Sequence, residues 1–262
     1  QDASHTPSDI DPITGSYYSE TLEGTEEDDY FDSAGGDDRV IGKGGNDTLL
    51  IHENSSKFTV ITLEGLTKII GNSYAGDYAR DTIVMYQVEL ISFADGDLTV
   101  TTDLPDNLLL GTSRVDNWTG TDQDEVVDIA GGDDIIDGGA GNDTVLIFAN
   151  KSHFQVITLG GVTKLYADST YGVNDYARDT ITLRNIESVQ FADQTLTLDA
   201  EALDIAQGTT TGESFTGTDG DDFFDPAGGD DIIDGGAGND KVFIYSTSDH
   251  FDIITLAGIT KL

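Results

Sequence analysis

The sequence contains no cysteine and only 12 lysine and arginine residues among its 262. Without cysteine the chain has no disulfide framework, no thiolate metal site and no cysteine nucleophile. Against the few basic residues stand 50 acidic ones, which gives a net charge of −38. Nucleic acids and anionic membrane surfaces carry charge of the same sign, so both are excluded as partners and cations are favoured.

Long apolar runs and catalytic motifs are also missing. No run of about 18 apolar residues occurs, so no membrane insertion is predicted, and any export signal is expected outside this sequence because Gln1 starts no signal-peptide pattern. HExxH, GxSxG and P-loop motifs are absent. His153 and His250 share a repeat position that holds Lys57 in the first copy, which indicates a solvated face. We therefore predict that the chain is not an enzyme.

What the chain does contain is a tandem repeat of about 97 residues. The stretch GGDDIIDGGAGND occurs at 131–143 and again at 228–240, inside longer copies that align from Gly24, Gly120 and Gly217. The third copy stops at Leu262, in mid-strand by comparison with the other two, so the sequence is expected to be a piece of a longer chain. An apolar content of 37%, with 10 Tyr and 11 Phe, is too high for a disordered acidic tail.

A shorter repeat of nine residues runs through each copy. Four consecutive units start at each of Gly15, Gly111 and Gly208, and in all twelve units the sixth position is acidic and the eighth is apolar. GGAGNDTVL (138–146) and GGAGNDKVF (235–243) fit the pattern GGxGxDxUx, in which U is apolar. These units resemble the repeats-in-toxin (RTX) family of hemolysin-type calcium-binding repeats. The resemblance implies a parallel β-roll, Ca²⁺ as the ligand, and type I secretion to an extracellular location.

The physical chemistry of stacked turns indicates the same ligand. Six residues of each unit form a turn and three form a short strand, so two units complete one coil and residues 18 apart stack at about 4.8 Å. Two carboxylates at this spacing repel by about 3 kcal/mol, and a divalent cation between them reverses the sign. Backbone carbonyls complete an oxygen shell that suits Ca²⁺ better than Mg²⁺. Glycine lets those carbonyls face the ion because it adopts φ values that side chains forbid.

The predicted metal ligands are the twelve sixth-position residues, with about two ions in each roll. Three stacked pairs join two aspartates: Asp29 and Asp47, Asp116 and Asp134, and Asp222 and Asp240. Three pairs contain a glutamate: Glu20 and Asp38, Glu125 and Asp143, and Glu213 and Asp231. The longer glutamate leaves two interpretations, either a weak, water-bridged or empty site or a turn that only caps the roll. Because the apo chain should repel itself strongly, calcium binding is expected to drive folding.

The predicted fold class is all-β, with parallel β-roll blocks alternating with antiparallel β-rich spacers. FTVITLEGLTKII and its two counterparts are typical of hairpins with two-residue turns. Lys68, Lys164 and Lys261 on these hairpins, and Arg80 and Arg178 in two copies of DYARDTI, are expected to balance nearby acids. The predicted organisation is a lead-in (1–14), repeat 1 (15–110, roll 15–50 and spacer 51–110), repeat 2 (111–207, roll 111–146 and spacer 147–207) and a truncated repeat 3 (208–262, roll 208–243 and hairpin 244–262).

Three functions remain open at this point. The alternation of roll and spacer predicts a secreted structural protein, such as a surface layer, an extracellular fibre or matrix component, or an adhesin stalk, with self-association or cell-surface attachment. The rival is a calcium-dependent folding and export module of a larger RTX toxin or secreted hydrolase. A sugar- or ice-binding adhesin module would need an exposed aromatic or threonine-rich patch on the spacer, for which the candidate aromatic residues are Tyr74, Tyr78, Tyr171 and Tyr176.

Overall fold

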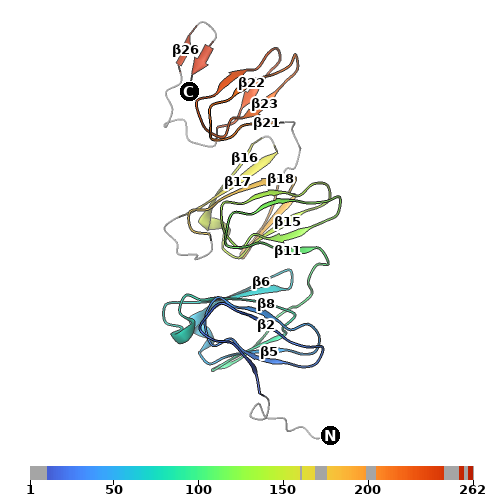
Figure 1. Ribbon diagram of the computed structural model, residues 1–262, viewed down its shortest axis with the longest axis vertical. Coiled ribbons are helices and arrows are strands. Elements are labelled where there is room, and N and C mark those ends of the chain that lie inside the picture. The colour runs from blue at the N-terminus through green and yellow to red at the C-terminus, as the bar shows by residue number, and fades with distance from the viewer. Residues whose placement is uncertain are drawn as a thin grey trace.

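The computed structural model describes residues 11–159, 161–168, 176–198, 205–244, 254–256 and 259–261. In these residues β-strands alternate with turns, the few helices are three-residue 3₁₀ turns, and no α-helix occurs. Three β units follow one another along the long axis of the molecule, with the N-terminus at one end and the C-terminus at the other (Figure 1). The predicted all-β fold class is confirmed.

Unit 1 consists of two five-stranded sheets, called sheets A and B here. Sheet A has the order β1 (Ile13–Thr14), β3 (Tyr30–Asp32), β5 (Thr48–Ile51), β9 (Leu90–Phe93) and β10 (Gly96–Thr99). Sheet B has the order β2 (Thr21–Glu23), β4 (Arg39–Ile41), β8 (Thr82–Tyr86), β7 (Leu66–Gly71) and β6 (Phe58–Leu63). The 3₁₀ turns η2 (Ser55–Lys57) and η3 (Gly76–Tyr78) flank the β6–β7 hairpin.

Unit 2 repeats this arrangement in sheets C and D. Sheet C has the order β11 (Leu108–Leu110), β13 (Val126–Asp128), β15 (Thr144–Ile147), β19 (Ser188–Phe191) and β20 (Thr195–Thr197). Sheet D has the order β12 (Asn117–Thr119), β14 (Ile135–Asp137), β18 (Thr180–Arg184), β17 (Val162–Ala167) and β16 (Phe154–Leu159). The turn η4 (Lys151–His153) precedes β16.

Unit 3 has the same beginning within the described residues. One sheet contains β21 (Ile205–Gln207), β23 (Phe223–Asp225) and β25 (Lys241–Val242), and the other contains β22 (Ser214–Thr216) and β24 (Ile232–Asp234). The strands β26 (Ile254–Leu256) and β27 (Ile259–Lys261) pair antiparallel as a hairpin. Within all the described residues, no helix has the length and apolar character that crossing a membrane requires.

The nine-residue repeat builds the coils as predicted. Three-residue strands on opposite sheets are joined by six-residue turns, and residues 18 apart are parallel partners, as in Phe31 with Leu49 and Leu22 with Val40. The eighth-position side chains of Phe31, Val40 and Leu49 are fully buried between the sheets. Each strand is therefore short because only positions seven to nine are free of the turn, and the inward position is apolar because the two sheets face each other.

The strands before each block belong to the rolls. The structure places Ile13–Thr14 in β1, which pairs parallel with β3, and Leu108–Leu110 and Ile205–Gln207 pair in the same way with β13 and β23. Each roll therefore begins at least two residues before the predicted starts at 15, 111 and 208. The physical reason is that the residues before the first glycine form a strand, and this strand pairs with the corresponding strand of the next coil.

The spacers contain the predicted hairpins and also add a coil that the sequence analysis missed. In the β6–β7 turn, Glu64 and Gly65 have φ values of 45° and 76°, typical of a two-residue type I′ turn. β7 then pairs antiparallel with β8, but β8 and β9 pair parallel with β4 and β5. A third coil thus follows the nonapeptides, and it was missed because the hairpin interrupts it.

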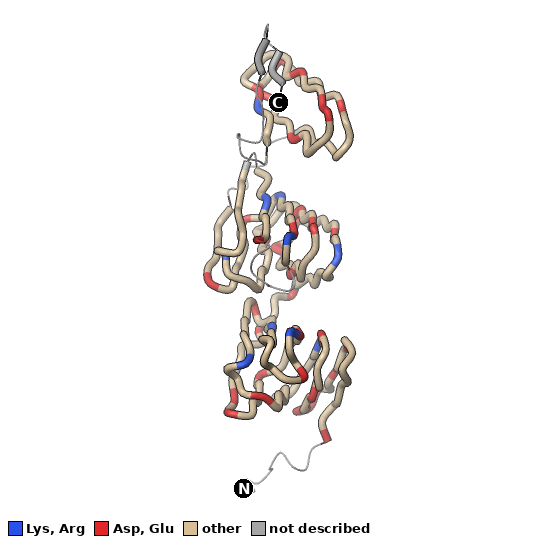
Figure 2. Tube along the Cα trace, turned by 90° about the vertical axis from the view of Figure 1, so that its left-hand side faces the viewer, with Lys and Arg blue, Asp and Glu red and all other residues tan. Residues whose placement is uncertain are grey.

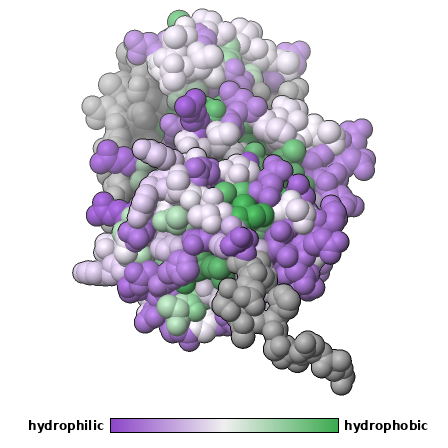
Figure 3. Space-filling view, turned by 60° about the horizontal axis from the view of Figure 1, so that its bottom comes forward, coloured by the Kyte–Doolittle hydropathy of each residue, from purple (hydrophilic) through white to green (hydrophobic). Residues whose placement is uncertain are grey.

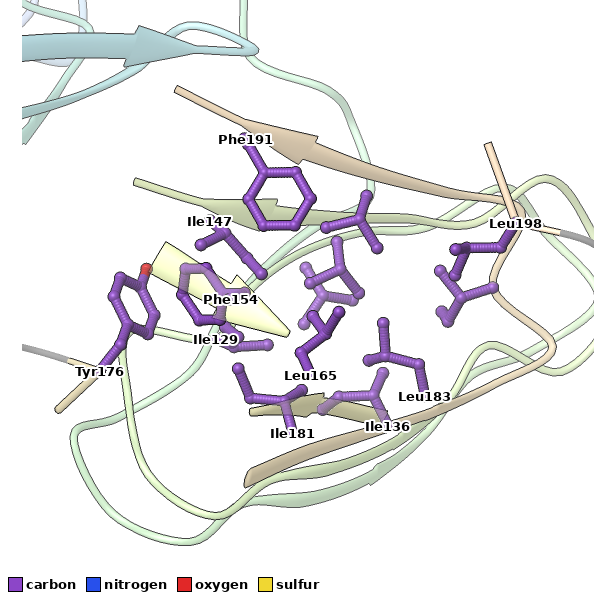
Figure 4. Packing of buried hydrophobic residues seen from close by; sticks show 14 of the residues in the cluster. Ile129, Ile136, Ile147, Phe154, Leu165, Tyr176, Ile181, Leu183, Phe191 and Leu198 are labelled. Carbon is purple, nitrogen blue, oxygen red and sulfur yellow. The ribbon is translucent and has the colours of Figure 1, made fainter. Parts of the chain in front are cut away.

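Roll and spacer share one core in each of the first two units. In unit 2, Ile136 of the roll lies beside Leu165, Ile181 and Leu183 of the spacer, as Figure 4 shows. Phe154 and Tyr176 close one end of this core with ring centroids 5.8 Å apart, and Phe58 and Tyr78 repeat the contact in unit 1 at the same distance. The described strands of the spacers are therefore part of the folded unit.

Units 1 and 2 meet through an apolar junction that contains a buried ion pair. Leu63 and Leu66 of the β6–β7 hairpin pack in one cluster with Leu146 and Phe148 of unit 2. Beside them Lys68 Nζ lies 3.1 Å from Asp128 Oδ1 and 4.5 Å from the centroid of the Phe148 ring. Both charged side chains are at most 4% exposed. The hairpin lysine therefore fixes how unit 1 sits on unit 2.

Units 2 and 3 repeat the pairing. Lys164 Nζ lies 3.8 Å from Asp225 Oδ2, and burial lowers the pKa of this lysine while Asp225 opposes the shift. The expectation that Lys68 and Lys164 balance acids is confirmed, although each acid belongs to the following unit. The side chain of Lys261 lies outside the described residues, and the ion pairs expected for Arg80 and Arg178 stay predictions.

Lys68→Met is expected to destabilise the junction by roughly 3–5 kcal/mol, because it leaves Asp128 buried without a counter-charge. Urea unfolding in saturating calcium measures the loss, and the double variant K68M/D128N should regain most of it. Lys43→Met is the matched control, since Lys43 and Glu23 form an exposed pair at 3.4 Å that is worth less than about 1 kcal/mol. Equal losses for K68M and K43M would contradict a buried inter-unit pair.

Candidate metal centres

The predicted ligands lie at the ends of the six-residue turns, each directly before a strand. Asp29 precedes β3 and Asp47 precedes β5 at one edge of the unit 1 roll, whereas Glu20 and Asp38 precede β2 and β4 at the other. Figure 2 shows acidic residues distributed over all three units, with few basic residues between them. Figure 3 shows a mainly hydrophilic surface at the N-terminal end.

All six predicted pairs are stacked by the structure, and one hydrogen bond joins each pair. In every case a carboxylate Oδ1 of the second residue accepts the backbone N–H of the first. The distances are 2.9 Å for Glu20 and Asp38, 2.8 Å for Asp29 and Asp47, 2.8 Å for Asp116 and Asp134, 2.8 Å for Glu125 and Asp143, 2.9 Å for Glu213 and Asp231, and 3.0 Å for Asp222 and Asp240. The role of these residues as metal ligands remains a prediction.

The first member of each pair is held by a hydroxyl-bearing residue in its own turn. Thr25 donates its backbone N–H and its hydroxyl to Asp29 Oδ2, at 2.6 and 2.9 Å. Ser or Thr holds the other five in the same way: Ser16 holds Glu20, Thr112 holds Asp116, Thr121 holds Glu125, Thr209 holds Glu213 and Thr218 holds Asp222. At least one oxygen of each of these carboxylates therefore has a hydrogen-bond donor without an ion, whether the residue is Asp or Glu.

The second members in units 1 and 2 each carry a buried carboxylate oxygen with no hydrogen-bond partner among the described residues. These atoms are the Oδ2 atoms of Asp38, Asp47, Asp134 and Asp143, whose residues are at most 2% exposed. Burial, with neighbouring carboxylates adding to it, raises the pKa of Asp134 to about 7 and the pKa of each of the other three to about 6. A buried carboxylate oxygen without a donor requires a proton or a cation.

The first glycine of a turn is required by close approach of oxygen atoms. A Cβ added to Gly217 would lie 2.2 Å from Gly235 O of the next coil and 2.7 Å from Asp222 Oδ2. Further along the turns, Gly36 and Gly45 have φ values of 94° and 112°, the left-handed conformation that the sequence analysis expected. A side chain at the first position would therefore fill the space on which carbonyl and carboxylate oxygens converge.

This donor set fits a hard cation. The groups that converge are carboxylate and carbonyl oxygens, which are the ligands that Ca²⁺ takes. No group of three or more His, Cys, Asp or Glu side chains forms a metal site in the part of the chain that the structure describes. A site between two turns would therefore need backbone carbonyls in addition to two carboxylates, and this ligand set remains a prediction.

Four further carboxylates, which the sequence analysis did not select, join these edges from the third coil. Glu89 and Glu187 each accept the backbone N–H of the second member of a stacked pair, Asp47 or Asp143. Asp81 Oδ2 and Asp179 Oδ2 accept the N–H groups of Gly36 and Gly132 at 2.8 and 2.7 Å. A signal was present for the glutamates. Each stands two positions before a buried apolar residue, Ile91 or Val189, which is the spacing of positions six and eight.

Two of the four tyrosines considered for an adhesin module are buried. Tyr74 is exposed, but Tyr78 and Tyr176 are buried in the cores of units 1 and 2, and Tyr171 lies outside the described residues. The repeated DYARDTI segment therefore supplies a core aromatic and an acid that holds a turn. Tyr78 and Tyr176 are therefore not available for an exposed patch, because their rings pack inward.

Comparison with known proteins agrees with the geometry. A family model described as the RTX calcium-binding nonapeptide repeat matches the chain in four copies, over residues 14–49, 119–146 and 207–242. No curated protein sequence matches. Among solved structures, the extracellular lipase LipA from Serratia marcescens matches at 11% identity with a TM-score of 0.22, and the alignment covers 68% of this chain and 38% of the lipase.

The matched segments coincide with the coiled turns. They contain the stacked pairs of all three units except Asp116, which lies just outside the matched range in unit 2. Repeats of this family are typically non-catalytic and bind calcium. The chain therefore carries RTX calcium-binding nonapeptide repeats in each of its three β units.

Proposed function

We propose that the chain is a secreted, calcium-binding structural protein whose folding and rigidity depend on Ca²⁺ held between stacked turns. The observation that supports this proposal is the set of buried, unpartnered Oδ2 atoms of Asp38, Asp47, Asp134 and Asp143. At neutral pH an uncompensated buried carboxylate costs several kcal/mol. A divalent cation at the edge of the roll would remove that cost and would also screen the repulsion between stacked acids.

The twelve sixth-position residues are the proposed ligands, with about two ions in each roll. The second members offer an open oxygen, and the first members supply the opposite carboxylate that Ser or Thr orients. The hydrogen bond that joins the two members of a pair has the same length in pairs with Glu as in pairs with Asp. This favours the interpretation that the Glu-containing pairs also bind calcium, and not the one in which their turns only cap the roll. When bound, calcium supplies positive charge and ties successive coils together.

Rigid junctions favour a structural role over a folding module alone. The buried pair of Lys68 with Asp128 and the partly buried pair of Lys164 with Asp225 join consecutive units. A surface layer, an extracellular fibre or matrix component, or an adhesin stalk needs such fixed geometry, and would assemble by self-association or cell-surface attachment. Extracellular calcium modules typically bind at roughly 10⁻⁴–10⁻³ M, so the chain would fold after type I secretion.

The alternative is a calcium-dependent folding and export module of a larger RTX toxin or secreted hydrolase. The RTX repeats themselves support it, because calcium-coupled folding would serve either role. Fixed geometry between units is not needed for export. A protease, lipase or pore-forming region within the same polypeptide would decide for this alternative.

A calcium titration tests the proposal. Far-UV circular dichroism of the chain, started in chelator, is expected to change from coil to β-structure as Ca²⁺ is added, because binding free energy becomes folding free energy. A parallel Mg²⁺ titration should produce little change, since Mg²⁺ retains its water and demands octahedral geometry. A chain that already has its full β-signal in chelator would contradict calcium-dependent folding.

A pH titration in chelator tests the buried acids. Because the pKa of Asp38, Asp47 and Asp143 is raised to about 6 and that of Asp134 to about 7, the folded state binds protons more tightly than the unfolded state. Their stabilising contribution is full below the unfolded pKa near 3.8 and is lost as the pH rises through about 6 to 7. The calcium-free chain, which is expected to be unfolded at pH 7.5, should therefore regain part of its β-structure at pH 5, as far-UV circular dichroism would show.

In the presence of calcium, lowering the pH is expected to have the opposite effect and to weaken calcium binding. Protons compete with Ca²⁺ for the carboxylates, so the apparent calcium affinity is expected to fall as the pH decreases from 7.5 to 5. The D134N variant should flatten the upper part of the chelator profile, because it removes the group with the highest pKa of the four. A calcium-free chain whose far-UV circular dichroism does not change between pH 5 and pH 7.5 would contradict the idea that protons on these buried carboxylates can replace calcium.

A further inference from the structure

A short turn closes one edge of the roll in each of the first two units, outside the nonapeptide repeats. Residues 87–89 connect β8 to β9 in three residues, where the preceding turn at 42–47 uses six. Residues 185–187 connect β18 to β19 in the same way. Both short turns lie outside the segments that match the RTX repeat.

Each short turn extends the ladder of stacked carboxylates by one step. Glu89 Oε2 accepts the backbone N–H of Asp47 at 2.7 Å, just as Asp47 Oδ1 accepts the N–H of Asp29 at 2.8 Å. In unit 2, Glu187 Oε2 accepts the N–H of Asp143 at 2.6 Å. The short turn therefore still ends in a carboxylate, although it has three residues where the other turns have six.

The short turn also presents a carbonyl oxygen to an unpartnered carboxylate oxygen. A Cβ built on Gly42 would lie 1.6 Å from Gln87 O and 2.2 Å from Asp47 Oδ2, so these two oxygens are at most 3.8 Å apart, the sum of the two distances. At Gly138 the corresponding distances are 2.0 Å to Asn185 O and 2.4 Å to Asp143 Oδ2, which places them within 4.4 Å.

Two hydrogen-bond acceptors that face each other at this separation repel unless a cation or a proton lies between them. Asp47 Oδ2 and Asp143 Oδ2 are both buried and have no hydrogen-bond partner among the described residues. The carbonyls are held in place by an uncommon backbone, because Gln87 and Asn185 have φ values of 55° and 47° although neither is glycine. The same unfavourable arrangement in both units indicates a ligand.

We propose that residues 87–89 and 185–187 each complete a further Ca²⁺ site, one coil beyond the nonapeptide repeats. In unit 1 the donors are Asp47 Oδ2, Gln87 O and the Glu89 carboxylate, and in unit 2 they are Asp143 Oδ2, Asn185 O and the Glu187 carboxylate. Ca²⁺ is the cation because all the donors are oxygens and the site carries two carboxylates. This inference rests on the proposed calcium-dependent function and adds two sites to it, with Asp47 Oδ2 and Asp143 Oδ2 each bridging the new ion and the ion of the neighbouring stacked pair.

The double variant E89Q/E187Q tests the two sites. Glutamine keeps an amide oxygen for the N–H of Asp47 or Asp143 but removes one of the two negative charges that hold the ion. Equilibrium dialysis at a calcium concentration that saturates the natural chain, with elemental analysis of the bound metal, counts ions per chain. The variant is expected to bind two fewer ions while its circular dichroism in calcium is unchanged.

The matched control is E64Q/D97N, which removes two charges at exposed positions of the unit 1 spacer and should lose no ion. An unchanged ion count in E89Q/E187Q would overturn the inference and leave Glu89 and Glu187 as hydrogen-bond acceptors only. A natural chain that binds no calcium would instead overturn the proposed function itself. If the double variant does not fold, E89Q and E187Q alone should each lose one ion, and retention of the full count in both overturns the inference.

Discussion

The structure depends on stacking acidic residues at the spacing of a parallel sheet. Nine-residue units force residues 18 apart into register, and the sixth position brings one carboxylate over another at the edge of every coil. Hydroxyl groups of Ser and Thr satisfy the first carboxylate of each pair, so the electrostatic problem falls on the second. In units 1 and 2, each second member therefore buries a carboxylate oxygen that needs a cation or a proton.

The spacers add a further coil to each of the first two rolls. The hairpin leaves the roll after β5, and the chain then returns as β8 and β9, which pair in parallel with the roll and pack into the same core. Roll and spacer consequently fold as one unit, and the hairpin carries the lysine that enters the next unit. The same spacer thus forms both the last coil of the roll and the contact with the next unit.

Much of this could be predicted from the sequence, because the period of nine places acids and apolar residues at fixed positions. The coils, the six stacked pairs and the hairpin turn at Glu64–Gly65 followed from local pattern alone. The third coil could not be predicted in that way, since about thirty residues separate β5 from β8 and their pairing is not local. Glu89 carried the right spacing to Ile91, but its turn lacks the glycines that identify the repeat. The burial of Tyr78 and the partner of Lys68 depend on tertiary packing that no period encodes.

The two faces that meet at a junction are different. Hairpin strands of one unit contact roll strands of the next, and the lysine always comes from the preceding unit and the aspartate from the following one. Such a contact has polarity and no symmetry axis, so it does not close on itself as a dimer interface does. Duplication of one unit within the gene would lengthen the molecule by a constant step and leave both of its ends unaltered. The length of such a molecule would therefore scale with the number of repeats, without a change in any contact between units.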